Sequence, residues 1–235
     1  MNNSLLRLTG VVLLIALGVW AGAWVYSARG TGPSRPGLPV AAGRASPPNP
    51  SDVADGADTD GQPPRAKIPG RLPAFALADR NGKPTSIRSF ANQSLIINFW
   101  ATWCAPCRRE IPLLQALQAE WAGRDTTVVG IAVDHRDRVL EFADRFKMTY
   151  PLLIGEQDAL DAASALGVDT PVFPFTVFTD RRGEIVALFI GELHRPQAEL
   201  ILNEVQNLNQ GRIALPAARR TIAAGLVQLA SKHAS

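Results

Sequence analysis

The chain's only two cysteines, Cys104 and Cys107, lie in the segment Trp103-Cys104-Ala105-Pro106-Cys107. An apolar run at 95–100 precedes them, and the residues that follow have helical periodicity. A cysteine at a strand-to-helix junction lies near unpaired backbone N–H groups, and these donors and the helix dipole favour a thiolate over a thiol. Because the thiolate is the nucleophile that attacks disulfides, the pair is suited to thiol–disulfide exchange.

Two other roles for the cysteine pair are disfavoured. A purely structural bridge would close a very small loop and stabilise the fold little through loop entropy. A single CxxC supplies two metal ligands where a closed zinc site needs four, and His135, His194 and His233 are scattered without ligand spacing. The chemistry of the pair therefore requires neither a metal nor an organic cofactor.

The elements around the cysteines are those of an α/β fold. Strands are predicted where apolar residues run nearly continuously, and helices where they recur at three- and four-residue spacing. Pro112 is expected to kink the helix after the cysteines because it removes a backbone donor. The predicted strands are 73–78, 94–100, 126–133, 175–179 and 184–190, and the predicted helices are 106–121, 138–147, 159–166 and 196–208.

The order of these elements predicts a mixed central sheet flanked by helices. A strand–helix–strand passage of the length of 94–133 favours a right-handed parallel crossover. The turn residues at 180–183 favour a hairpin, whose strands are antiparallel. The sheet is therefore expected to be parallel in its first half and antiparallel in its second.

The N-terminal segment, residues 1–29, is expected to be a membrane anchor. Leu8 to Tyr26 contains no charged residue and is long enough to cross a hydrocarbon core as a helix. A cleaved signal peptide with a small-residue site at Ala21-Gly22-Ala23 is the alternative. The length of the apolar stretch and the aromatic residues at its end favour an uncleaved anchor.

Residues 30–70 are predicted to be a flexible Pro/Gly-rich linker. The segment holds half of the chain's 18 prolines and almost no large apolar side chains, so it cannot bury enough surface to offset chain entropy. The net charge of the whole chain, +3, is mild and mixed in sign. No basic patch is interleaved with aromatic residues, so nucleic acid is not an expected partner.

The C-terminal tail, residues 209–235, is basic and predicted to be helical. No acidic residue follows Glu204, and Ile222, Leu226 and Leu229 share one helical face. An accessory helix packed on the domain is the favoured interpretation, and a helix lying on a membrane surface is the alternative. The basic residues are Arg212, Arg219, Arg220 and Lys232.

The segment Asn98-Phe99-Trp100-Ala101-Thr102-Trp103-Cys104-Ala105-Pro106-Cys107-Arg108-Arg109-Glu110 resembles the active-site segment of the thioredoxin superfamily. More narrowly, it is similar to the membrane-anchored bacterial disulfide reductases of the TlpA/ResA type. The resemblance extends from about Pro73 to Leu208 and includes Pro112 and the segments 130–134 and 173–178. It implies a thioredoxin fold over a domain at 71–208.

The resemblance also implies a division of roles within the site. Cys104 would attack a substrate disulfide and Cys107 would resolve the mixed disulfide. Pro174 would be cis and face the dithiol, while Phe173 would present its backbone to an extended substrate. The substrates would be disulfide-containing proteins, and a transmembrane thiol reductase would supply electrons. The catalytic domain would lie on the periplasmic or outer side of the cytoplasmic membrane, held by a single span.

Several residues near the cysteines are further site candidates. The buried Asp of cytosolic thioredoxins falls at Asn98, which cannot titrate, whereas Glu110 matches a Glu that lines the site in this subfamily. Glu110 is therefore a candidate proton-transfer group whose pKa burial would raise, with an ordinary acidic residue of an early helical turn as the alternative. Trp103 and Pro106 are expected at the substrate surface, and Trp100 in the core.

Three other activities are alternatives to disulfide reduction, and the sequence lacks a feature typical of each. A reductase dedicated to cytochrome c maturation would carry a Gly-Val-x-Gly-x-Pro-Glu signature, which residues 167–174 lack. A copper-delivery module of the same fold would use a wider cysteine spacing and a His near Phe173 or Pro174. A peroxidase would have Thr three residues before the cysteine, where this chain has Ala101.

Overall fold

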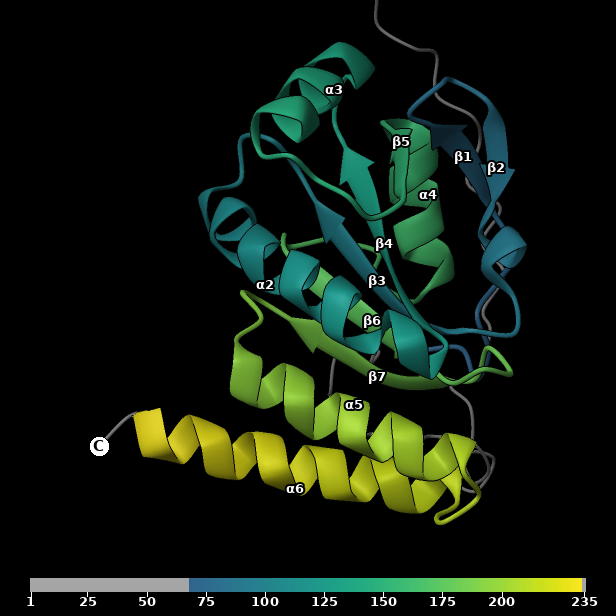
Figure 1. Cartoon of the computed structure of the whole chain (residues 1–235), viewed down its shortest axis with the longest axis vertical. Helices are drawn as coiled ribbons and strands as arrows, with labels where there is room; N and C mark the ends of the chain where they lie inside the picture. Colours follow the sequence, from purple (N-terminus) through teal and green to yellow (C-terminus); the bar gives the residue numbers. More distant parts are fainter. Residues whose placement is uncertain (1–67, 234–235) are drawn as a thin grey trace, which may run out of the picture. The chain divides into compact units, whose positions relative to one another are not determined.

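A seven-stranded mixed sheet forms the centre of the fold in a computed structural model that describes residues 68–233 (Figure 1). Its strand order is β2-β1-β5-β4-β3-β6-β7. The pairs β3–β4 and β4–β5 are parallel, and the other neighbours are antiparallel. The strands are β1 (Ala76–Asp79), β2 (Pro84–Ser86), β3 (Ser94–Trp100), β4 (Thr126–Val133), β5 (Leu152–Gly155), β6 (Phe175–Thr179) and β7 (Ile185–Ile190).

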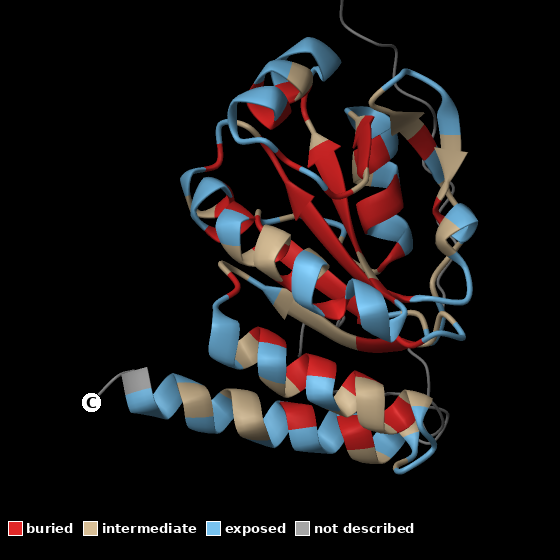
Figure 2. Ribbon diagram, in the orientation of Figure 1, coloured by how far each residue is buried: buried red, intermediate tan, exposed pale blue. Residues whose placement is uncertain are grey.

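Helices cover both faces of this sheet. One core lies between the sheet and helices α2, α3 and α5, and a second core lies under α4 and η1 on the other face. Every residue of β3 is buried, and its side chains alternate between the two cores, as expected for a strand covered on both sides (Figure 2). The helical segments are α2 (Ala105–Trp121), α3 (Arg136–Arg145), α4 (Gln157–Ala165), α5 (Arg195–Asn209), α6 (Leu215–His233), η1 (Ile87–Phe90) and η2 (Ala122–Arg124).

The predicted strands and helices are confirmed in type, with local differences in extent. Strands 94–100, 126–133 and 175–179 match the structure, whereas the first strand begins at Ala76 rather than Pro73. Helix α3 ends earlier than predicted, because Lys147 adopts a positive φ of 51°, which a right-handed helix cannot contain.

The expectation of a sheet parallel in its first half is wrong for its first strands. Strand β1 pairs antiparallel with both β2 and β5. Neither β2 nor β5 was anticipated, because strands of three and four residues are too short for an apolar pattern to emerge. The parallel pairing is confined to β3, β4 and β5, where the crossover rule applies.

The C-terminal tail forms the long helix α6, which lies alongside α5 (Figure 1). Ala218 and Ile222 are buried at this contact, and Leu226 packs against the same core. Arg219 donates from α6 to the backbone carbonyl of Ile185 in β7. These contacts confirm that the tail is helical and that it packs on the domain as an accessory helix.

The predicted anchor at 1–29 and nearly all of the predicted linker at 30–70 lie outside the described residues. Within residues 68–233, none of the helices has the length and apolar character that crossing a membrane requires.

Candidate active site

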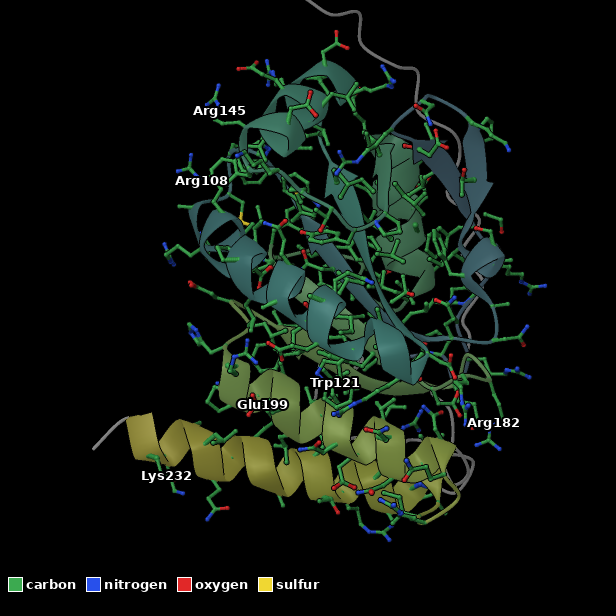
Figure 3. All side chains as sticks on the ribbon, in the orientation of Figure 1. Arg108, Trp121, Arg145, Arg182, Glu199 and Lys232 are labelled. Atoms are coloured by element: carbon green, nitrogen blue, oxygen red, sulfur yellow. A yellow bond between two sulfur atoms is a disulfide. The ribbon has the colours of Figure 1, made fainter. Side chains whose placement is uncertain are left out.

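The two cysteines form a disulfide at the start of α2. Cys104 is the N-cap residue of the helix, and its sulfur accepts a hydrogen bond from the Cys107 backbone N–H at 3.3 Å. Pro106 stands in the first turn, where its missing N–H costs no helical hydrogen bond. Cys104 is 5% exposed and Cys107 is fully buried, so Cys104 is the more exposed of the two residues. Figure 3 shows the sulfur atoms at the end of α2 from which Arg108 projects outward.

The loop between β3 and α2 is hydrogen-bonded to the residue that follows β4. The Thr102 backbone N–H donates to the Asp134 carboxylate at 3.2 Å, and the Thr102 hydroxyl donates to the same oxygen. Asp134 also accepts from the His135 backbone N–H at 2.8 Å and lies 3.9 Å from the Arg138 guanidinium; it is buried, as acidic residues seldom are unless they are paired. Sequence reasoning assigned no role to Asp134, although an acidic residue directly after a buried strand was an available signal.

Glu110 lies on the buried face of α2, one turn beyond Cys107. It is 2% exposed, its Oε1 accepts from the Asn98 side-chain amide at 2.7 Å, and its Oε2 accepts from the Leu193 backbone N–H at 2.9 Å. Burial raises the pKa of Glu110 from 4.5 to about 7, although both hydrogen bonds oppose the rise and the nearby Glu192 charge adds to it. A buried carboxyl with this pKa exchanges a proton at neutral pH.

Two more polar groups are buried near this carboxyl. The Asn98 amide also donates to the Thr176 hydroxyl at 3.1 Å, which fixes the orientation of the amide. Tyr150 is buried, and burial first, then the charge of Glu110, raises the pKa of its hydroxyl. Within the described residues, neither the Tyr150 hydroxyl nor the Trp100 indole N–H has a hydrogen-bond partner. Sequence reasoning placed Trp100 in the core, which is confirmed, but it missed Tyr150.

The loop before β6 lies next to the cysteine segment. The Phe173–Pro174 peptide bond is cis, as expected for Pro174. The Phe173 ring meets the Trp103 ring edge-on, with centroids 6.1 Å apart, so the loop and the residue before Cys104 are in contact. Trp103 is 67% exposed and Val172 is 64% exposed, which leaves apolar surface beside the disulfide.

The structure thus brings all the predicted site residues to one region. Cys104, Pro106, Cys107 and Glu110 lie in the first turns of α2, and Trp103 joins them to the Phe173–Pro174 loop. A cavity of about 660 Å³ lies elsewhere, since it is lined by η1 and the β6–β7 turn and by none of these residues. An open apolar surface beside a disulfide suits a macromolecular substrate better than an enclosed small molecule.

Comparison with known proteins identifies the same chemistry. The profile of the AhpC/TSA family matches residues 68–188. The thioredoxin-like protein YneN of Bacillus subtilis is 31% identical over 135 residues, which cover 55% of this chain and 75% of that protein. The thiol-disulfide oxidoreductase ResA of Geobacillus kaustophilus is 28% identical over 135 residues, covering 57% of this chain and 75% of its own length.

Solved structures agree with these sequence relatives. A secreted thiol-disulfide isomerase of Corynebacterium glutamicum superposes with a TM-score of 0.53 at 29% identity, covering 59% of this chain and 85% of that chain. A DsbF homologue of Corynebacterium diphtheriae does so with a TM-score of 0.51 at 25% identity, covering 57% and 85%. With a disulfide at the start of α2 beside a cis-proline loop, the chain belongs to the AhpC/TSA family of thioredoxin-like proteins and is a thiol–disulfide oxidoreductase.

Proposed function

We propose that this oxidoreductase works in the reducing direction on protein disulfides outside the bacterial cytoplasm. The Cys104 thiolate attacks one sulfur of a substrate disulfide, a Cys104–substrate bond forms, and the other substrate sulfur leaves as a thiolate that takes up a proton. Cys107 then loses its proton and attacks Cys104, which releases the second substrate thiol. Two electrons and two protons pass to the substrate, and the Cys104–Cys107 disulfide remains.

The observation that carries this direction is the burial of Glu110 beside Cys107. The two residues are three positions apart in α2, so their side chains are neighbours on one helix face, and both are buried there. A buried carboxylate disfavours a nearby thiolate by like charge. Because a more stabilised thiolate makes a dithiol couple more oxidising, a destabilised one favours reducing work.

Glu110 has a second role in this proposal, as the proton acceptor for Cys107. The resolving step requires a Cys107 thiolate, yet the sulfur lies in a buried position where a thiol is favoured. A group with a pKa near the working pH is best matched to take up and return that proton, and the pKa of Glu110 is about 7. Asn98 and the Leu193 N–H hold its two oxygens in place.

The substrate is held by the apolar surface around the disulfide. Trp103 and Phe173 form its two aromatic sides, Pro106 lies between the two cysteines in the sequence, and Pro174 follows Phe173 in the neighbouring loop. Aromatic side chains supply large contact area at low entropic cost, and backbone groups beside Pro174 suit an extended segment. We therefore assign these four residues to substrate binding.

The proposed location is the periplasmic or outer face of the cytoplasmic membrane. Residues 8–26 would anchor the chain, and a random-coil linker of about 40 residues would give the domain a root-mean-square reach of about 35 Å. That reach allows contact with both a membrane thiol reductase, as electron donor, and nearby substrates. Protein disulfides persist in oxidising compartments, and the Corynebacterium glutamicum relative is a secreted protein, which supports this placement.

The reduction potential tests the proposed direction. The full chain is equilibrated with glutathione buffers, and the fraction of the Cys104–Cys107 disulfide is measured after acid quenching and alkylation. Thioredoxin lies near about −270 mV and the oxidant DsbA near about −120 mV, and we expect a value on the thioredoxin side. The pair should then be mostly disulfide in a buffer poised at about −200 mV. A pair that is mostly dithiol in that buffer would rule out the reducing direction.

A further inference from the structure

Three consecutive residues of the loop between β7 and α5, 191–193, each form a hydrogen bond or ion pair with a different part of the site. The Gly191 backbone N–H donates to the Pro174 carbonyl at 2.9 Å, and the Leu193 backbone N–H donates to Glu110 Oε2 at 2.9 Å. Gly191 has a φ of +106°, a conformation that side chains rarely permit, so a glycine is needed where the loop turns. The loop therefore touches the cis-proline segment and the buried carboxyl at once.

Glu192, the residue between these two, forms an ion pair with Arg109 at the surface. The Arg109 Nε donates to both Glu192 carboxylate oxygens at 3.0 Å, and its Nη2 donates to Oε2 as well. An exposed ion pair of this kind contributes little to the stability of a fold. Its position in the site therefore matters more than its energy. Arg109 directly precedes Glu110 and Glu192 directly precedes Leu193, so the ion pair lies beside the Leu193–Glu110 hydrogen bond.

We propose that the Arg109–Glu192 ion pair is a positioning device that holds the Leu193 N–H against Glu110 and thereby stabilises the carboxylate form of Glu110. The Arg109 guanidinium donates to the Glu192 carboxylate through two nitrogens. This bidentate contact restrains the orientation of the loop, which a single charge contact would not do. The consequence for turnover rests on the proposed role of Glu110 in proton transfer. Through Gly191, the same loop also connects Glu110 with the cis-proline segment that meets the substrate.

Several other groups lie near Glu110, and they affect its charge or are affected by it. Asn98 donates from β3, and Tyr150 is buried nearby with its hydroxyl raised in pKa in part by the Glu110 charge. The Glu192 charge raises the pKa of Glu110, whereas Arg109 and His194 lower the pKa of Glu192. Cys107 is uncharged in the disulfide. An experiment on the oxidised protein therefore isolates the loop from the thiols.

The test is a ¹³C NMR titration of the Glu110 side-chain carboxyl in the oxidised full chain, with the signal assigned by its loss in Glu110→Gln. Arg109→Lys keeps the charge but loses the fork, and the double variant Arg109→Ala/Glu192→Gln keeps the summed charge of the pair. We expect the Glu110 pKa to rise by about one unit in Arg109→Lys, since one hydrogen bond to the carboxylate is weakened, and to rise less in the double variant, since loss of the Glu192 charge lowers it. Arg108→Ala, on the same turn and without a carboxylate partner in residues 68–233, is the matched control and should leave the pKa unchanged.

If Arg109→Lys titrates like the parent, the ion pair does not position the loop and the proposal is overturned. A rise in Arg108→Ala as large as in Arg109→Lys would overturn it too, because the change in the Glu110 pKa would then not be specific to the Arg109–Glu192 ion pair. The role of Glu110 itself is judged separately: Glu110→Gln that exchanges disulfides at the parent rate contradicts the proposed proton transfer but leaves this titration valid.

Discussion

The Asn98 side-chain amide donates to Glu110 Oε1 at 2.7 Å in the interior of the domain, between β3 and α2. Asn98 stands at the position where cytosolic thioredoxins carry a buried Asp, and it cannot titrate. The hydrogen bond places the titratable carboxyl of Glu110, on α2, in contact with the Asn98 side chain. The group to which we assign proton transfer, the Glu110 carboxyl, therefore lies on α2 and not on the strand.

Replacing Glu110 should alter the kinetics of exchange without unfolding the domain. Glu110→Gln keeps a similar shape but neither accepts a proton from Cys107 nor repels a thiolate, so the resolving step should slow by about 10²-fold. The pH dependence of thiol alkylation in the reduced protein should shift to lower pH, because a like charge is lost. Glu120→Gln, on the exposed face of the same helix, is the control. An unchanged rate and pH profile would return Glu110 to a structural role.

The stability of the oxidised protein should fall as pH rises from 5 to 8. Glu110 titrates near 4.5 in the unfolded chain and near 7 in the fold, so the folded state binds its proton more tightly. The contribution of this group is complete below about pH 4.5 and is lost as pH rises through 7, by on the order of 3 kcal/mol. Urea unfolding at both pH values measures the loss. Glu110→Gln should show a much smaller difference, and an equal difference would contradict the pKa assignment.

Trp103 should matter for protein substrates more than for small disulfides. Trp103→Ala removes an exposed ring that meets Phe173 beside the disulfide, so kcat/KM for a disulfide-bonded protein should fall by about tenfold, or ~1.4 kcal/mol. The rate with oxidised glutathione, which is too small to span this surface, should change little. Val227→Ala alters an equally exposed apolar residue of α6 and serves as the control. Equal losses with both substrates would remove Trp103 from the binding surface.

The domain should lie outside the cytoplasm, attached by its N-terminal segment. A reporter enzyme that folds only outside the cytoplasm, fused after Gln62, is expected to be active. Charge alone does not decide the orientation, because Arg7 precedes the predicted span and Arg29 and Arg35 follow it closely. An inactive reporter with intact expression would contradict the location. A soluble mature protein lacking residues 1–23 would contradict the anchor only.

The sequence was most informative where burial leaves a local pattern. Strand β3 was located from its apolar run, which both faces of the sheet require, and the dithiol was recognised from its place before a helix. The short strand β5 was missed because four residues carry no periodicity. The cis bond at Pro174 followed only from family resemblance, since X–Pro bonds in general are mostly trans.

The hydrogen-bond partners of Glu110 could not be predicted from any local sequence pattern. Leu193 is separated from Glu110 by 83 residues in the sequence, and it binds through its backbone, which every residue type except proline offers. Glu192 and Arg109 resemble ordinary surface charges until the loop places them together. A sequence can therefore nominate the carboxyl, whereas the groups that set its proton affinity depend on the tertiary fold.

The most direct measurement of the central claim is the trapping of the mixed disulfide. Reduced Cys107→Ala full chain is mixed with a disulfide-bonded protein, and the linked species is digested and identified by mass spectrometry. The account predicts a covalent complex joined through Cys104, which is the more exposed cysteine and the helix N-cap, and predicts none with Cys104→Ala. A complex joined through Cys107 in Cys104→Ala, or no complex with Cys107→Ala, would contradict the assignment of Cys104 as the attacking residue.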